Sequence, residues 1–207
     1  MQSNDQKSPR ILPRALLMLG NSLTTANSMP NLLAQIANAR VAVHARGGAQ
    51  LAEHLNPATR LGSATQEALA SGRFDYVVLQ EMSHKPATNP TAYQQAVTAL
   101  CAQIRAAGAT PVVYATWAYA PDCPRLEKLG LSYEEMAQRM QENCQQAAVK
   151  NGALLADPGR IFRQRADRAL WAADGVHPSP SGSLLAAKCI AHACGFLQDE
   201  HLYESEE

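Results

Sequence analysis

Short apolar runs alternate with longer, alanine-rich stretches along most of the sequence, and this alternation restricts the fold more than any other feature. Strands that alternate with helices indicate βαβ units and a parallel sheet. We therefore predict an α/β protein, a three-layer α/β/α sandwich with a five-stranded, mainly parallel sheet. The expected strands are Ala15 to Leu19, Arg40 to His44, Tyr76 to Gln80, Pro111 to Thr116 and Ala153 to Ala156, and the expected helices are about 30–39, 60–71, 91–107, 132–150 and 181–195.

Length and charge restrict the kind of protein further. The chain has 207 residues, which favours one domain, since domains commonly run to about 100–200 residues. We expect residues 11–198 to form that domain, residues 1–10 to be a disordered polar segment, and residues 199–207 to be an acidic tail. Lys and Arg together number 18, as do Asp and Glu, so the net charge gives no support for binding to nucleic acid or to an anionic membrane.

The absence of targeting patterns and the cysteine pattern add two expectations. No apolar run approaches the roughly 18 residues that a transmembrane helix requires, and the start of the sequence is polar. We therefore expect a soluble cytoplasmic protein, or a periplasmic or secreted one if a signal peptide was removed. The five cysteines are odd in number and show no spacing suited to zinc, which favours buried free thiols and no metal site.

Two motifs carry the side chains of a candidate nucleophile and base. Gly20-Asn21-Ser22-Leu23 ends the first apolar run, where a glycine permits a tight turn and leaves the serine hydroxyl at the mouth of the sheet. Asp174-Gly175-Val176-His177-Pro178 precedes the last predicted helix. Its spacing lets the Asp174 carboxylate hold Nδ1–H of His177 while Nε2 stays free to take a proton. Taken alone, each motif also fits an ordinary turn.

Two further motifs carry hydrogen-bond donors. Gly47-Gly48 follows the second strand and can present a backbone N–H, and Gln80 ends the third strand with an amide that can donate to a developing oxyanion. Because the carboxyl ends of parallel strands meet at one edge of a sheet, all four motifs are expected at that edge. Their coincidence carries more weight than any one of them.

Together these motifs resemble the SGNH, or GDSL, hydrolases. The resemblance rests on the serine turn near the N-terminus, the glycine after the second strand, the amide after the third, and Asp-x-x-His-Pro near the C-terminus. The blocks Gly-Asn-Ser-Leu-Thr, Leu-Gln-Glu and Asp-Gly-Val-His-Pro-Ser are similar to those of one branch of that superfamily. The similarity runs from about residue 15 to residue 195.

The resemblance implies a flavodoxin-like α/β/α fold and ester hydrolysis through an acyl-enzyme, without a metal or organic cofactor. It assigns Ser22 as the nucleophile, His177 as the general base and Asp174 as the residue that orients the base. The backbone N–H groups of Ser22 and Gly48 and the side chain of Gln80 would form the oxyanion hole, which stabilises negative charge on the substrate oxygen. Gln80 stands where the superfamily has Asn, and its side chain is one methylene longer.

Several other residues lie in segments that are expected to border the site. His84 is a candidate substrate contact, with a solvated loop histidine as the alternative. Trp117 and Trp171 have flat amphipathic rings that suit the wall of a sugar or acyl site, and core or lid packing is the alternative. Glu81 is expected to brace backbone amides, and His54 to form structural hydrogen bonds on a short helix beside the site.

The first functional hypothesis is a serine esterase that releases a short acyl group, with acetyl as the first choice, from a carbohydrate or another polar alcohol. The alternatives are a lipase or thioesterase for longer acyl chains, and a non-catalytic binding protein in which Asn21, at the position of the family's Asp, and Gln80 mark decay. The intact Ser22, Asp174 and His177 favour an enzyme. The expected partner is a small-molecule ester, and no oligomeric state is predicted.

Overall fold

A computed structural model describes residues 14–198, so the expected N-terminal segment and acidic tail lie outside the described residues. The described part contains a five-stranded, wholly parallel sheet in the order β2-β1-β3-β4-β5. This arrangement confirms the predicted fold class. The strands are β1 (Ala15–Gly20), β2 (Arg40–Ala45), β3 (Tyr76–Leu79), β4 (Thr110–Tyr114) and β5 (Leu154–Ala156).

The central strand β1 shows why this sequence forms a parallel sheet covered on both faces. All six of its residues are buried. Leu16 and Met18 pack into one core cluster, while Leu17 and Leu19 pack into a second cluster on the opposite face. A strand buried on both faces reads as a continuous apolar run rather than as an alternation of apolar and polar residues.

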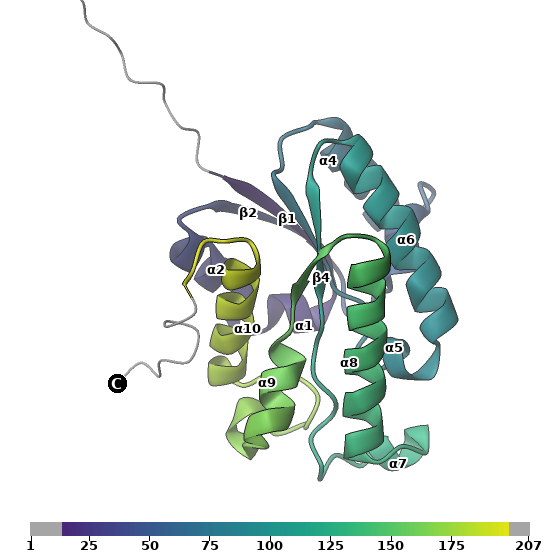
Figure 1. The fold of residues 1–207 in the computed structure, drawn as a ribbon, viewed down its shortest axis with the longest axis vertical. Coiled ribbons are helices and arrows are strands. Elements are labelled where there is room, and N and C mark those ends of the chain that lie inside the picture. The colour runs from purple at the N-terminus through teal and green to yellow at the C-terminus, as the bar shows by residue number, and fades with distance from the viewer. Residues whose placement is uncertain (1–13, 199–207) are drawn as a thin grey trace, which may run out of the picture.

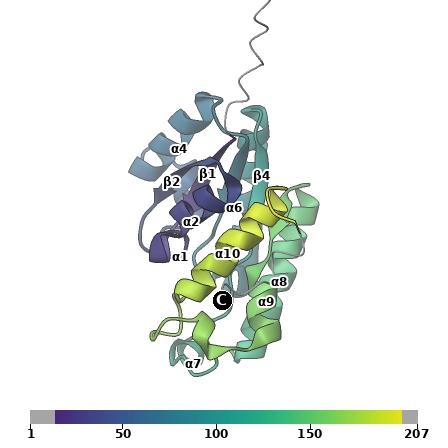
Figure 2. The same ribbon diagram turned by 90° about the vertical axis from the view of Figure 1, so that its left-hand side faces the viewer.

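Five long helices form the two outer layers. The helices α2 (Met29–Ala37) and α10 (Pro180–Ala193) lie on one face of the sheet, which is turned toward the viewer in Figure 2. The helices α4 (Arg60–Ala70), α6 (Pro90–Ala106) and α8 (Tyr133–Lys150) cover the other face (Figure 1). These five correspond to the five predicted helices.

Local capping explains where several helices begin. The Asn89 side chain accepts a hydrogen bond from the N–H of Ala92 at the start of α6. At the start of α8, Ser132 and Glu135 form a capping box, in which each side chain pairs with the backbone N–H of the other residue. Short polar residues ahead of a first helical turn are therefore a reliable signal in this chain.

Shorter helices lie mainly at the carboxyl ends of the strands. They are α1 (Ser22–Thr25), α3 (Leu51–Leu55), α5 (Lys85–Thr88), α7 (Arg125–Leu129) and α9 (Pro158–Arg165), with 3₁₀ turns at Ala26–Ser28 and Arg168–Leu170. Of these, the sequence predicted only α3, the short helix around His54. The others are too short to show the helical periodicity on which such a prediction depends.

Two expectations about the whole chain can be compared with the described residues. All five cysteines are free and buried, as predicted. Within residues 14–198, no helix is long and apolar enough to cross a membrane.

The strand order places a crevice at the carboxyl ends of β1 and β3. From β1 the chain continues to β2 on one side, and β3 then pairs with β1 on its other side. In open α/β sheets such a reversal of direction is the usual ligand-binding position. Ser22 follows β1 and Gln80 follows β3, so both lie at this switch point.

Candidate active site

A hydrogen-bonded chain joins the three residues that the sequence predicted as a triad. Ser22 Oγ lies 2.9 Å from Nε2 of His177. Nδ1 of His177 lies 2.5 Å from Oδ2 of Asp174. Ser22 is the first residue of α1, whereas the other two lie in the loop before α10, about 150 residues later. The fold thus brings these three side chains, hereafter the triad, into the order of a nucleophile, a base and an orienting carboxylate.

The Asp174 carboxylate is fixed by its own loop as well as by His177. Its Oδ1 accepts hydrogen bonds from the backbone N–H groups of Val176 (3.0 Å) and His177 (2.9 Å). Partial burial raises the pKa of the Asp174 carboxyl, but the hydrogen bonds from the His177 ring and the two N–H groups outweigh it and lower that pKa to about 2. The carboxylate therefore stays ionised throughout the neutral pH range.

The loop of residues 171–178 is closed on itself. Trp171 and Pro178 form an antiparallel bridge. Inside it, the N–H of Ala172 donates to the backbone carbonyl of His177 at 2.8 Å. This closure presents the imidazole from a braced loop rather than from a helix.

The segment after β4 holds this loop from outside. Trp117 Nε1 donates to the carbonyl of Val176 (3.0 Å), and the N–H of Ala120 donates to the carbonyl of Gly175 (2.7 Å). Gly175 has a φ of +68°, and a Cβ there would lie 2.9 Å from Cβ of Cys123. Both the left-handed backbone and the close approach therefore require glycine between the triad's acid and base.

The nucleophile turn is braced by Gln80 from the neighbouring strand. Oε1 of Gln80 accepts hydrogen bonds from the N–H of Asn21 (2.9 Å) and from Oγ1 of Thr24 (3.0 Å). A Cβ on Gly20 would lie 2.3 Å from Oγ1 of Thr24 and 2.7 Å from Oε1 of Gln80, so only glycine leaves room for this contact. The turn that presents Ser22 is therefore fixed from β3.

This geometry does not meet the expectation that Gln80 donates to an oxyanion. The side chain is fully buried, and Nε2 donates to the backbone carbonyl of Glu81. Because the extra methylene folds the amide back against the backbone, its oxygen serves as an acceptor for the nucleophile turn. In this arrangement Gln80 holds the turn that carries Ser22.

Asn21 ties together the ends of three strands. Its Oδ1 accepts from the N–H of Leu23 (3.1 Å) and caps α1, while Nδ2 donates to the carbonyls of Ala49 (3.0 Å) and Glu81 (3.4 Å). An aspartate here would lack the two N–H donors. The departure from the superfamily's Asp is therefore accounted for by two backbone acceptors and does not indicate decay of the site.

Two backbone N–H groups remain as candidate oxyanion donors. Within the described part of the chain, no hydrogen bond uses the N–H of Ser22 or of Gly48. Gly48 has a φ of +70° and is followed by Ala49, whose carbonyl is held by Asn21. The loop after β2 is thereby anchored beside the nucleophile turn.

Glu81 braces backbone amides, as expected. Its side chain is buried, and Oε1 accepts from the N–H groups of Met82 (2.7 Å) and Leu51 (3.3 Å). Burial raises the pKa of Glu81, although these two hydrogen bonds and the Lys85 ammonium, 4.0 Å away, oppose the rise. The contact with Leu51 fixes the start of α3, directly after the Gly48 loop.

Trp117 and Trp171 do not line an open substrate wall, and this part of the prediction is wrong. Both are buried, with 1% and 3% of their surface exposed. Trp117 stacks on Phe162 with ring centroids 4.2 Å apart, and Trp171 meets the same ring edge-on at 4.9 Å. Trp171 Nε1 donates to the carbonyl of Ala118. Their rings are amphipathic, but the polar edges bind backbone carbonyls and thereby support the triad's loop.

The two remaining residues singled out in the sequence are His84 and His54. His84, half-buried on the segment after β3, has Nδ1 3.0 Å from Oγ1 of Thr88, and burial lowers its pKa. His54 on α3 is fully buried with Nδ1 2.9 Å from Oγ1 of Thr65, in accordance with a structural role. No triad atom is hydrogen-bonded to either histidine in the described structure.

Sequence reasoning missed Thr24 and Asn27. The Thr24 hydroxyl reaches Gln80, and the Asn27 amide reaches the carbonyl of Pro178, next to His177. The only signal for Asn27 was its place in a run of turn-forming residues between the serine and Pro30, which says nothing of a partner about 150 residues away.

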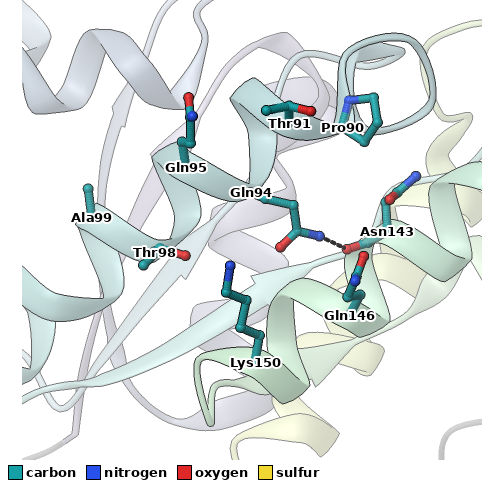
Figure 3. A pocket seen from close by; sticks show the side chains of 9 residues that line it. All are labelled: Pro90, Thr91, Gln94, Gln95, Thr98, Ala99, Asn143, Gln146 and Lys150. Carbon is teal, nitrogen blue, oxygen red and sulfur yellow. Dashed lines mark hydrogen bonds between the residues drawn. The ribbon is translucent and has the colours of Figure 1, made fainter.

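Outside the triad, a metal centre and a second cavity are the other places where chemistry could occur. Among the described residues, no group of three His, Cys, Asp or Glu side chains is arranged to hold a metal ion. A cavity of about 700 Å³ lies between α6 and α8 (Figure 3), where Gln94 Nε2 donates to the carbonyl of Asn143 at 2.8 Å. Four amide residues and Lys150 line this cavity together with Pro90, Thr91, Thr98 and Ala99, and no triad residue lines it.

A flavodoxin-like sheet with Ser, His and Asp hydrogen-bonded at its carboxyl edge is typical of hydrolases that act through an activated serine. The chain belongs to the GDSL-like lipase/acylhydrolase family, which matches residues 18–185. It is an ester hydrolase of the SGNH type.

Solved structures agree with this assignment. A proposed SGNH hydrolase from Slackia heliotrinireducens is 56% identical, with a TM-score of 0.87 over 89% of this chain and 100% of the other. At 15% identity, the acetyl xylan esterase AlAXEase shares the fold, with a TM-score of 0.64 over 86% of this chain and 98% of its own. The psychrotrophic esterase EstA from Pseudoalteromonas sp. also shares it, at 14% identity and a TM-score of 0.62 over 88% of this chain and 97% of its own. No curated protein shows a significant match.

Proposed function

We propose that this ester hydrolase releases a short acyl group, acetyl in the first instance, from a carbohydrate or another polar alcohol through an acyl-enzyme on Ser22. The observation that carries the proposal is the hydrogen-bonded chain from Ser22 Oγ through His177 to Asp174, with links of 2.9 and 2.5 Å. This arrangement activates a hydroxyl that is otherwise a weak nucleophile.

In the first half of the reaction, Ser22 Oγ attacks the ester carbonyl while Nε2 of His177 takes its proton. The Asp174 carboxylate holds Nδ1–H and stabilises the imidazolium that forms. The tetrahedral intermediate then collapses: its bond to the alcohol oxygen breaks, and the proton on Nε2 passes to the departing alcohol. The products of this half are the free alcohol and an ester between the acyl group and Ser22.

In the second half, water takes the place of the alcohol. His177 removes a proton from water as it attacks the acyl carbon, and returns a proton to Ser22 Oγ when the acyl–serine bond breaks. The carboxylic acid leaves and the triad is restored. In both halves the backbone N–H groups of Ser22 and Gly48 are proposed as the donors to the oxyanion, without Gln80.

The exposure of the triad supports a polar alcohol. The side chains of His177 and Asp174 are 38% and 43% exposed, so the base faces solvent rather than an apolar tunnel. Withdrawal of Trp117 and Trp171 into the core removes two aromatic surfaces that a long acyl chain would contact. His84, on the segment after β3, is proposed as a contact to the alcohol. Because the acetyl xylan esterase shares the fold, we choose an acetylated sugar as the first substrate to test beyond the p-nitrophenyl esters.

The test is hydrolysis of p-nitrophenyl acetate and butyrate by wild type and Ser22→Ala, followed by release of acetate from an acetylated xylo-oligosaccharide. We expect wild type to turn over the acetate ester faster than the butyrate ester, and Ser22→Ala to fall to the buffer rate for both. Equal rates for wild type and Ser22→Ala would refute the nucleophile. A butyrate rate well above the acetate rate would instead favour the lipase or thioesterase alternative.

A further inference from the structure

The chain adopts an unfavourable backbone directly after the nucleophile helix. Asn27 (φ 50°, ψ 31°) and Ser28 (φ 54°, ψ 32°) are consecutive residues in the left-handed region. Residues with a Cβ rarely adopt this conformation, and Asn tolerates it better than most because its short polar side chain can form local hydrogen bonds. Two such residues in a row persist only where the surroundings hold them.

Hydrogen bonds from Asn27 supply that restraint, and they reach across the active site. Nδ2 of Asn27 donates to the carbonyl of Pro178 (2.9 Å) and to Oγ of Ser183 (2.9 Å) in the first turn of α10. The Ser183 hydroxyl is fully buried and donates in turn to the carbonyl of Ala26 (3.4 Å). The Asn27 side chain and the Ala26 carbonyl are thus both hydrogen-bonded to the segment that follows His177.

These contacts hold the segment that carries Ser22 against the segment that carries His177. Among the described residues, four hydrogen bonds join residues 22–28 to residues 177–183: the one between Ser22 and His177, the two from Asn27, and the one to Ala26. The hydrogen bonds from Trp117 and from Ala120, after β4, also hold this loop but do not connect it to the serine turn.

We infer that Asn27 is a positioning residue for the triad: its amide, aimed by the left-handed backbone, locks the His177 loop against the nucleophile turn and keeps Ser22 Oγ within reach of His177 Nε2. The inference rests on the proposed roles of Ser22 and His177. Proton transfer depends steeply on this separation, and a displacement of about 1 Å can cost about 10²-fold in rate. The loss should therefore fall on kcat more than on KM.

Two variants separate the amide from the backbone. Asn27→Asp keeps the size and the tolerance for the left-handed region, but places a carboxylate oxygen against the Pro178 carbonyl. Asn27→Gly removes the amide and relieves the backbone. With p-nitrophenyl acetate, we expect kcat to fall about 10- to 100-fold in both, more in Asn27→Asp, while KM stays within about threefold. The rate at which a fluorophosphonate labels Ser22 should fall in parallel.

Ser28→Gly is the matched control, because it relieves the adjacent left-handed residue, whose side chain makes no capping hydrogen bond, and leaves the Asn27 amide in place. We expect its kcat to stay within about twofold of wild type. Thermal unfolding of every variant checks that the assayed protein is folded. The inference is overturned if folded Asn27→Gly and Asn27→Asp keep the wild-type kcat. It is also overturned if the decrease in activity of these variants is explained entirely by the fraction of protein that is unfolded.

Ser22→Ala distinguishes this failure from failure of the proposed function. If Ser22→Ala is inactive while both Asn27 variants keep the wild-type kcat, only the positioning role is wrong. If Ser22→Ala keeps the wild-type rate, the proposed nucleophile itself is wrong and the inference falls with it.

Discussion

Gln80 offers a sharp test, because its two candidate roles predict different effects on stability. In the structure Oε1 accepts from the Asn21 N–H and the Thr24 hydroxyl in a fully buried position. Gln80→Met keeps a similar unbranched shape but leaves both donors without an acceptor. Each unpaired buried donor costs about 1–3 kcal/mol, and since the Thr24 hydroxyl can rotate to another partner, we expect a total loss of about 2–4 kcal/mol in the free energy of unfolding.

Urea unfolding measures the stability of Gln80→Met, and p-nitrophenyl acetate hydrolysis measures kcat under conditions where the variant is folded. The bracing role predicts the stability loss together with a kcat decrease of about tenfold or more, because the Ser22 turn is released. An oxyanion donor would instead give a kcat loss of about 10²- to 10³-fold at unchanged stability. That second result would refute the bracing role.

Thr24→Val provides a control for the same network. It removes the hydroxyl while leaving the Asn21 N–H paired with Gln80, so we expect a loss of only about 1 kcal/mol. Because the two residues share one hydrogen bond, the double variant should be less destabilised than the sum of the single variants.

Two other predictions follow from buried groups around the site. Burial, and to a lesser extent the proximity of His44, lower the pKa of His54 from 6.5 to about 4. The unfolded chain therefore binds a proton at His54 more readily than the folded protein does. The contribution of neutral His54 to the free energy of unfolding is complete above pH 6.5. It falls as the pH drops toward 4, by about 3 kcal/mol in total. Urea unfolding of wild type and His54→Gln at several pH values isolates this slope, and identical pH dependence in the two proteins would contradict it. Trp117→Phe should lower stability by about 1–3 kcal/mol, because the buried Val176 carbonyl loses its donor, and should leave KM for acetyl esters unchanged; a clear rise in KM at unchanged stability would restore Trp117 as a substrate contact.

The triad could be predicted because its evidence lies in local sequence. The spacing of Asp174 and His177 allows their side chains to meet within one turn, and Ser22 comes shortly after an apolar strand that ends at Gly20. The carboxyl ends of parallel strands share an edge, so the fold class places the Ser22 turn beside Gln80, whereas His177 reaches that edge from the loop before α10.

The contacts of Gln80, Trp117 and Trp171 could not be predicted in the same way. The sequence places each of them beside the site, but the direction of a side chain depends on which backbone acceptors and rings surround it. Gln80 has one methylene more than Asn and binds backbone groups, while both indoles bind carbonyls from distant segments.

The sequence by itself therefore determined the layers of the fold, the edge of the sheet that carries the chemistry, and the residues able to form a triad, since strand alternation and motif spacing are local properties. Only the tertiary structure decided how that triad is held. The partners of Asn27 lie 151 and 156 residues away, and no local pattern records a contact that arises only when helix α10 packs beside the nucleophile turn. Positioning of a catalytic group is a property of packing between distant segments, whereas its chemical identity is a property of the residue.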